Sequence, residues 1–173
     1  MTPHLPLRHG LLYVANTISG LLPQTRFFRL RNALYRSAGG HIEPGVRISG
    51  TARIPHPNVS IGAETWVGAG CELISTEDCG IAVGTRCDLG PGVMLVAGSH
   101  EIGNHYRRGS DRGNSSPVTV GAGSWVGARS VLLAGTIVGA GSVVAAGAVV
   151  RGQHPPDSLL AGVPATVVRR LPH

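Results

Sequence analysis

Lysine is absent from this chain of 173 residues, and aromatic residues make up only 4% of it. With so few large rings, small aliphatic side chains must fill the core of the single domain that this length allows. The 15 basic residues are all arginine, and nine acidic residues leave a net charge of +6. Such a charge favours anionic ligands such as nucleotide phosphates. Nucleic acid is not an expected partner, because the arginines are scattered and are not interleaved with stacking aromatics.

Several motifs are also missing, including a P-loop, a G-x-G-x-x-G fingerprint and any C-x-x-C pair. Cys71, Cys79 and Cys87 lack the paired spacing of zinc sites, so we expect no metal. An odd number of cysteines and no cleavable leader favour a cytoplasmic protein with reduced thiols.

No apolar stretch reaches the roughly twenty residues that a bilayer-spanning helix needs. The run from Leu11 to Leu22 ends at Pro23, and residues 24–37 predict an amphipathic helix with arginines on its polar side. We expect residues 1–40 to form a helical cap that covers the open end of the fold. The alternative is weak contact of this basic helix with a membrane surface.

Beyond the cap, aliphatic residues recur every six positions, which is the dominant pattern of the sequence. Glycine often follows the aliphatic residue, and we expect it to provide the backbone freedom of a sharp corner. Six residues form one short strand and one turn, so three such units close a triangular coil. Residues 41–154 therefore predict an all-β protein, a parallel β-helix of about five coils, since an ordinary β-sandwich does not require a constant step. The fifteen inward positions are Ile42, Ile48, Ile54, Ile61, Val67, Leu73, Val83, Leu89, Leu95, Val120, Val126, Leu132, Val138, Val144 and Val150.

Two insertions interrupt the repeat, one between Leu73 and Val83 and a longer one between Leu95 and Val120. Both fall at the third corner of their coils, so they leave adjacent levels of one corner. Asp78 follows the first inward leucine by the same offset as His100 follows the second, so we expect them to be neighbours. A carboxylate beside an imidazole raises its basicity, as a general base requires.

Three segments, "GSHEIG", "PVTVGAGSWVGARS" and "HPPDSLLAGVPATVVRRL", together resemble the hexapeptide-repeat acyltransferases, and in particular their sugar O-acetyltransferase branch. The resemblance implies a left-handed β-helix with an active-site loop at 98–117, followed by a short helix or tail at 155–173. It also implies acetyl-CoA (coenzyme A) as co-substrate, and a homotrimer whose active sites lie between protomers.

The resemblance further assigns roles to individual residues. His100 is the general base of a direct transfer, and Asp78 lies on the acceptor side. The loop residues Glu101, Tyr106 and Arg107 would then also face a small-molecule or glycan acceptor. The positions that match coenzyme A contacts are Trp125, Ala128, Ala146, Gly147, Arg151 and Arg169. The chain departs from the family at Arg151-Gly152, where a Thr-Lys pair is common, so the arginine that contacts the phosphates is left open.

The leading expectation is acetyl transfer to a hydroxyl of a sugar, a glycan or a glycosylated natural product. N-acetylation of an amino sugar or an amino acid precursor is the alternative, and Cys79 beside Asp78 leaves a covalent route open. A metal-dependent β-helix is less expected, because His100 and His105 share one loop and no other histidine lies in the central coils. A non-catalytic scaffold is disfavoured by the retained histidine and tail.

Overall fold

The computed structural model describes the backbone of residues 5–172, and the side chains of residues 8–109 and 113–172. The expected cap at 1–40 and the expected tail at 155–173 therefore each extend slightly beyond the described residues.

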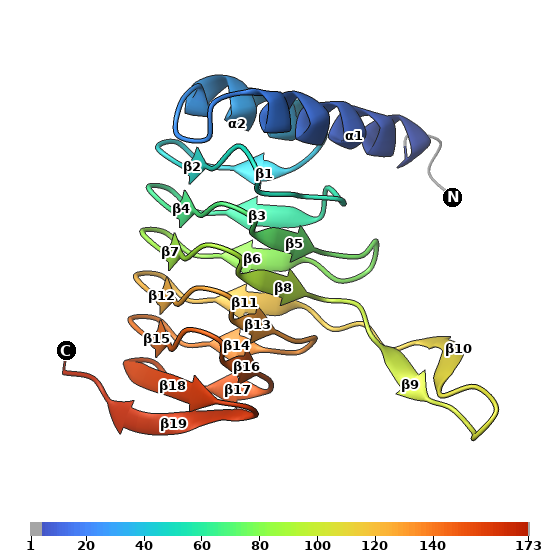
Figure 1. Ribbon diagram of the computed structural model, residues 1–173, viewed down its shortest axis with the longest axis vertical. Helices are drawn as coiled ribbons and strands as arrows, with labels where there is room; N and C mark the ends of the chain where they lie inside the picture. The colour runs from blue at the N-terminus through green and yellow to red at the C-terminus, as the bar shows by residue number, and fades with distance from the viewer. Residues whose placement is uncertain (1–4, 173) are drawn as a thin grey trace.

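Two helices, α1 (Leu5–Leu21) and α2 (Phe28–Ser37), lie side by side across one end of the molecule (Figure 1). The expected start of the second helix at residue 24 was wrong. The chain turns after Pro23, whose carbonyl accepts a hydrogen bond from the Arg26 amide, and Phe27 takes a left-handed φ of 56°. Because this conformation cannot continue a helix, α2 begins only at Phe28.

Arg31 fastens the cap to the first coil although it is fully buried. Its guanidinium donates to the carbonyls of Pro23, Arg26 and Ile48 at 2.8 to 3.1 Å. The Phe28 ring also packs edge-on against Trp66 at 5.9 Å between centroids. The helices therefore cover the end of the β-structure, as the sequence predicts.

The remainder is a left-handed parallel β-helix, which confirms the predicted fold class. Its three faces are sheets, which we call A, B and C. Strands from successive coils stack in parallel in each sheet, and only the final pair, β18 with β19, is antiparallel (Figure 1). Sheet A contains β1 (His41–Ile42), β3 (Val59–Ile61), β6 (Ile81–Val83), β11 (Val118–Val120), β14 (Ile137–Val138) and β17 (Gln153–His154). Sheet B contains β2 (Arg47–Ile48), β4 (Trp66–Val67), β7 (Asp88–Leu89), β12 (Trp125–Val126), β15 (Val143–Val144), β18 (Ser158–Gly162) and β19 (Ala165–Arg170). Sheet C contains β5 (Glu72–Ile74), β8 (Met94–Val96), β13 (Val131–Leu132) and β16 (Val149–Val150).

The core is a ladder of aliphatic side chains along the axis of the helix. All fifteen inward positions predicted from the period of six are at most 4% exposed. Leu160 on β18 pairs with Val144 and is also fully buried, so a partial sixth coil extends the ladder. The end opposite the cap is closed by the antiparallel β18–β19 hairpin, so the tail contains strands and not a helix.

The glycines that follow the inward residues have a different role from the expected one. Gly62, Gly84 and Gly127 do not have positive φ angles. Instead, a Cβ on Gly62 would lie 2.6 Å from the carbonyl carbon of Gly84 in the next coil, and one on Gly84 would lie 2.5 Å from the Ala122 amide nitrogen. The corners need glycine because neighbouring coils approach too closely for any side chain.

Candidate active site

The irregularities of the repeat share one corner, which joins sheet C to sheet A and which we call the C–A corner. The two insertions recognised in the sequence leave it after β5 and after β8, whose strands pair in register as Leu73 with Leu95. A third irregularity, the single extra residue between Ile54 and Ile61, falls at the same corner of the first coil. The other two corners keep the step of six throughout the five coils, so the variation is concentrated on one edge of the prism.

The shorter insertion folds back at once into a tight turn. The Thr76 amide donates to the Cys79 carbonyl at 2.9 Å, and the Cys79 amide donates to Thr76 Oγ1 at 3.0 Å. From the coil above, Asn58 Nδ2 donates to the carbonyls of Thr76 and Glu77 at 3.2 and 3.3 Å. The turn leaves Asp78 exposed at its tip.

The longer insertion projects from the prism as an antiparallel hairpin of β9 (His100–Ile102) and β10 (Gly109–Gly113) (Figure 1). Two backbone hydrogen bonds hold its base, from Asn114 to the Ser99 carbonyl at 2.8 Å and from Ser116 to the Ala97 carbonyl at 2.9 Å. His100 is therefore the first residue of the arm, and its side chain is exposed. This position places an imidazole where the arm meets the prism.

The two insertions start one above the other, which is the condition for the expected pairing of Asp78 with His100. The Ala97 amide donates to the Ile74 carbonyl at 2.9 Å, and a Cβ on Gly98 would lie 3.2 Å from the Thr76 methyl group. After that point the first insertion turns back and the second runs outward. Contact between the two side chains remains a prediction.

The expected acceptor-side residues Glu101, Tyr106 and Arg107 all lie on the hairpin. Asn104 Oδ1 accepts hydrogen bonds from the amides of Tyr106 and Arg107 at 3.0 and 3.2 Å, which shapes the tip. The Tyr106 ring lies 3.7 Å from that of His105 and is 87% exposed. An arm with an exposed ring at its tip is suited to contact a ligand or a second chain.

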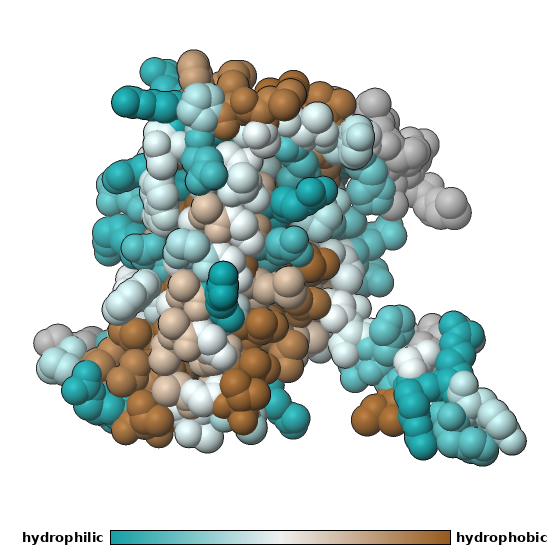
Figure 2. Space-filling view, viewed as in Figure 1, coloured by the Kyte–Doolittle hydropathy of each residue, from teal (hydrophilic) through white to brown (hydrophobic). Residues whose placement is uncertain are grey.

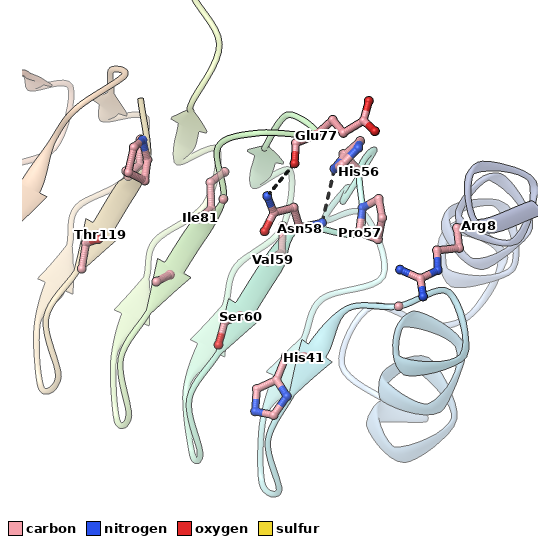
Figure 3. Close-up of a pocket in the computed structure, with 15 residues that line it drawn as sticks. Arg8, His41, His56, Pro57, Asn58, Val59, Ser60, Glu77, Ile81 and Thr119 are labelled. Carbon is pink, nitrogen blue, oxygen red and sulfur yellow. Dashed lines mark hydrogen bonds between the residues drawn. The ribbon is translucent and has the colours of Figure 1, made fainter. Parts of the chain in front are cut away.

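A groove of about 580 Å³ runs along sheet A from the cap to the base of the hairpin (Figure 3). At the cap end it is lined by Arg8 of α1 and by His41, and at the other end by Pro117. Its middle is lined by the polar side chains of Asn58 and Glu77, which belong to the C–A corner. The groove thus connects the corner that carries both insertions to the helical cap.

Sequence reasoning missed the groove residues, and His56 is an example. Its ring lies 5.2 Å from that of His9 on α1. Burial lowers the pKa of His56, the nearby His9 lowers it further, and Glu77 opposes the shift. The extra residue after Ile54 was the available signal for this part of the corner, whereas nothing in the repeat indicates that α1 contributes to the groove.

The expected coenzyme A residues lie at a different corner, where sheet B turns into sheet C. Ala128, Ala146 and Gly147 occupy turns on successive levels there, beside Trp125, which is 55% exposed on sheet B. Arg169 is exposed on β19 of the same sheet, and only Arg151 lies at the C–A corner. Within one chain, sheet C therefore separates His100 from most of the expected cofactor residues.

Two of the three cysteines have structural roles. Cys71 and Cys87 are buried, and their thiols donate to the carbonyls of Gly90 and Gly121 in the following coils at 3.1 and 3.2 Å. Burial raises the pKa of both thiols. Cys79 is half-buried and forms no disulfide with the other two cysteines. Among the residues that the structure describes, no cluster of histidine, cysteine and carboxylate side chains is suited to hold a metal ion.

Comparisons with known proteins agree with the repeat. The family described as bacterial transferase hexapeptide (six repeats) matches residues 117–152, and the hexapeptide repeat of succinyl-transferase matches residues 58–97. The galactoside O-acetyltransferase of Escherichia coli (strain K12) is 30% identical over 114 residues, which cover 66% of this chain and 55% of that protein. The chain thus spans little more than half the length of this curated relative.

Solved structures share the fold along nearly the whole chain. A galactoside acetyltransferase in complex with coenzyme A superposes with a TM-score of 0.80 at 22% identity, covering 99% of this chain and 84% of that one. A maltose O-acetyltransferase from Clostridium difficile 630 superposes with a TM-score of 0.79 at 21% identity, covering 99% and 90%. At these identities the superpositions establish a common fold.

Proposed function

We propose that the chain is a hexapeptide-repeat transferase that transfers acetyl from acetyl-CoA to a hydroxyl of a sugar, a glycan or a glycosylated natural product. The repeats matched at residues 58–97 and 117–152 and the similarity to a galactoside O-acetyltransferase support this proposal. The observation that carries the proposal is the position of His100 at the base of the hairpin, at the corner from which both insertions leave. The groove ends at Pro117, at the base of the same hairpin. We assign the reaction to the cytoplasm, where acetyl-CoA is available.

His100 acts as the general base in this proposal. Its imidazole takes the proton of the acceptor hydroxyl while the oxygen attacks the thioester carbonyl. The tetrahedral intermediate then collapses, the carbon–sulfur bond breaks, and the imidazolium returns the proton to the departing thiolate. The products are an acetyl ester and free coenzyme A. Asp78, one coil above, would orient the ring.

The turns at the corner between sheets B and C fit a pantetheine chain. The backbone amides of Ala128 and Ala146 form no hydrogen bond within the described part of the chain. They lie on adjacent coils, about 4.8 Å apart, and their side chains are too small to block access. Amide groups of coenzyme A could satisfy these donors while Trp125 forms one wall, and Arg151 or Arg169 would bind the phosphates.

The two halves of this site lie on opposite edges of sheet C, so we propose that it is completed between copies of the chain. His100 of one protomer would face the turns around Ala146 of its neighbour, and the exposed hairpin would bridge them. A cyclic homotrimer closes such an arrangement, because each protomer then contributes both edges once.

The test follows release of free thiol from acetyl-CoA over a panel of sugar, glycan and amino-sugar acceptors. His100→Ala should lower kcat by at least about 100-fold, since general-base catalysis contributes roughly 10² to 10⁴. His105→Ala, on the same hairpin, is the matched control and should keep its activity. Full activity of His100→Ala on the best acceptor would refute the assignment, and Cys79→Ala tests the covalent route. Preference for the amino sugars would identify N-acetylation instead.

A further inference from the structure

The outward side of α1 carries large apolar side chains, as well as the side that packs against the prism. The inner side of α1 buries three of its own residues: Leu12, Ala15 and Ser19. On the opposite side, Tyr13, Val14 and Leu21 are 74%, 47% and 82% exposed. No charged residue occurs from Leu11 to Leu21. A helix with large apolar side chains on both sides, covered on one side only, has an unpartnered apolar surface.

Cationic residues border this surface, and no anionic ones do. Arg26 and Arg29 are exposed, and they are neighbours in the chain of the apolar residues Phe27 and Leu30, which are 56% and 47% exposed. The first acidic residue of the chain is Glu43, in the first coil. The cap therefore combines exposed apolar side chains with positive charge alone.

The helices lie across the end of the prism, so their outer side is the end surface of the molecule (Figure 1). Figure 2 shows hydrophobic residues along this end, with hydrophilic ones beside them. We call the set the cap face: Leu11, Tyr13, Val14, Leu21, Phe27 and Leu30, with Arg26 and Arg29. Among the described residues, no helix has the length and apolar character to cross a membrane.

We propose that the cap face docks on the surface of an anionic lipid bilayer. In this arrangement α1 lies parallel to the surface, with its apolar side chains at the level of the upper acyl chains. Arg26 and Arg29 bind the lipid phosphates at the headgroup level. The inner side of α1 stays packed on the first coil, so docking requires no unfolding of the cap.

Docking on a bilayer also narrows the acceptor class, a step that rests on the proposed function. The groove starts at Arg8, on α1, and reaches Pro117, at the base of the hairpin. It crosses four strands of sheet A, β1, β3, β6 and β11, which is three coil steps or about 14 Å. A glycan anchored in the bilayer could therefore enter beside the cap and present a hydroxyl at the C–A corner. We infer a membrane-anchored glycan as acceptor.

The docking test uses co-sedimentation of the full chain with vesicles of phosphatidylcholine alone, or of phosphatidylcholine with 30% phosphatidylglycerol. Binding should be at least about tenfold tighter to the anionic vesicles, and it should weaken as salt rises. Val14→Ser/Leu21→Ser and Arg26→Gln/Arg29→Gln should each lower the affinity by about tenfold or more. The matched controls, Val163→Ser/Val168→Ser and Arg86→Gln/Arg129→Gln, change similar side chains away from the cap and should bind like the wild type.

Absence of vesicle binding, equal binding to both vesicles, or equal loss in the controls would overturn the proposal. Loss of self-association by Val14→Ser/Leu21→Ser without vesicle binding would show that a second copy covers the face. Thermal unfolding of each variant confirms that it is folded. Because sedimentation requires no catalysis, docking can succeed or fail independently of the transfer reaction.

The acceptor class has its own test. Faster acetylation of a lipid-linked oligosaccharide in anionic vesicles than of the same soluble glycan supports a membrane-anchored acceptor, and equal rates would refute it.

Discussion

Arg31 brings a charged side chain into the interior, and none of the described carboxylates forms an ion pair with it. Its partners are backbone carbonyls, Nε has no partner, and burial lowers the pKa of the guanidinium. Burying this group is costly, but it satisfies three carbonyls from two segments: two in the connection between the helices and one in the first coil. Its role is to join the cap to the prism.

Removing the Arg31 guanidinium should therefore weaken the packing of the cap on the first coil. We expect Arg31→Met to lower the free energy of unfolding by about 2–4 kcal/mol, because several buried carbonyls lose their donors. Arg31→Lys should recover only part of the loss, since an ammonium cannot reproduce the planar fork. Urea unfolding measures both, and Arg29→Met on the exposed side of α2 should change stability by less than about 0.5 kcal/mol. Equal losses at residues 29 and 31 would contradict this role.

At the same scale, the buried thiol of Cys71 should make the free energy of unfolding depend on pH. Burial is the main cause that raises the pKa of its thiol from about 9 to about 11. The folded state holds the proton more tightly than the unfolded chain, so this stabilisation is complete below pH 9 and is lost as pH rises towards 11. Stability should fall over that range by about 2–3 kcal/mol. Cys71→Ser keeps a small donor, as Ser130 does at the same corner two coils later, and should reduce the alkaline loss.

Among the elements, the strands were predictable and the connections were not. The period of six identifies the fifteen inward side chains of the five coils because each must fit the same narrow core. The start of α2 was missed because the left-handed conformation of Phe27 has no local sequence signal. Likewise, the residues of the groove depend on where α1 packs, which a repeat count does not contain. The C–A corner itself, with His100, could be located by counting alone.

The sequence also did not show why the corners need glycine, and the close contacts there give a prediction at the scale of elements. Gly84→Ala should destabilise by about 3 kcal/mol or more, because its Cβ would meet the backbone of Ala122 and the coils would have to separate. Gly123→Ala is the control: its φ is 70° but nothing lies within 4 Å, so about 1 kcal/mol of backbone strain is expected. Chemical unfolding of both variants measures the difference. If Gly123→Ala is the more damaging, backbone freedom and not coil spacing governs these corners.

At the level of the whole molecule, a site shared between copies can be tested by complementation. His100→Ala removes the base, and Ala146→Trp should fill the turn that we assign to coenzyme A, so each homo-oligomer should be inactive. Mixed oligomers should regain activity, because some interfaces combine an intact His100 with an intact turn at Ala146. Co-expressed, doubly tagged oligomers provide the sample, and thiol release provides the measurement. Mixtures as inactive as the parents would place the whole site within one chain.

The restriction of extra residues to the C–A corner also bears on how this fold can acquire new specificity. At the other two corners, which join sheet A to sheet B and sheet B to sheet C, neighbouring coils pack closely at glycines. These contacts leave no space for a longer connection. The third edge carries one, four and nineteen additional residues in successive coils, while the stacking beneath it stays regular. Substrate recognition can therefore diverge by exchange of whole loops at the C–A corner, with no change in the packing of the core. Grafting a different segment between Ala97 and Ser116 is the corresponding engineering route to a different acceptor.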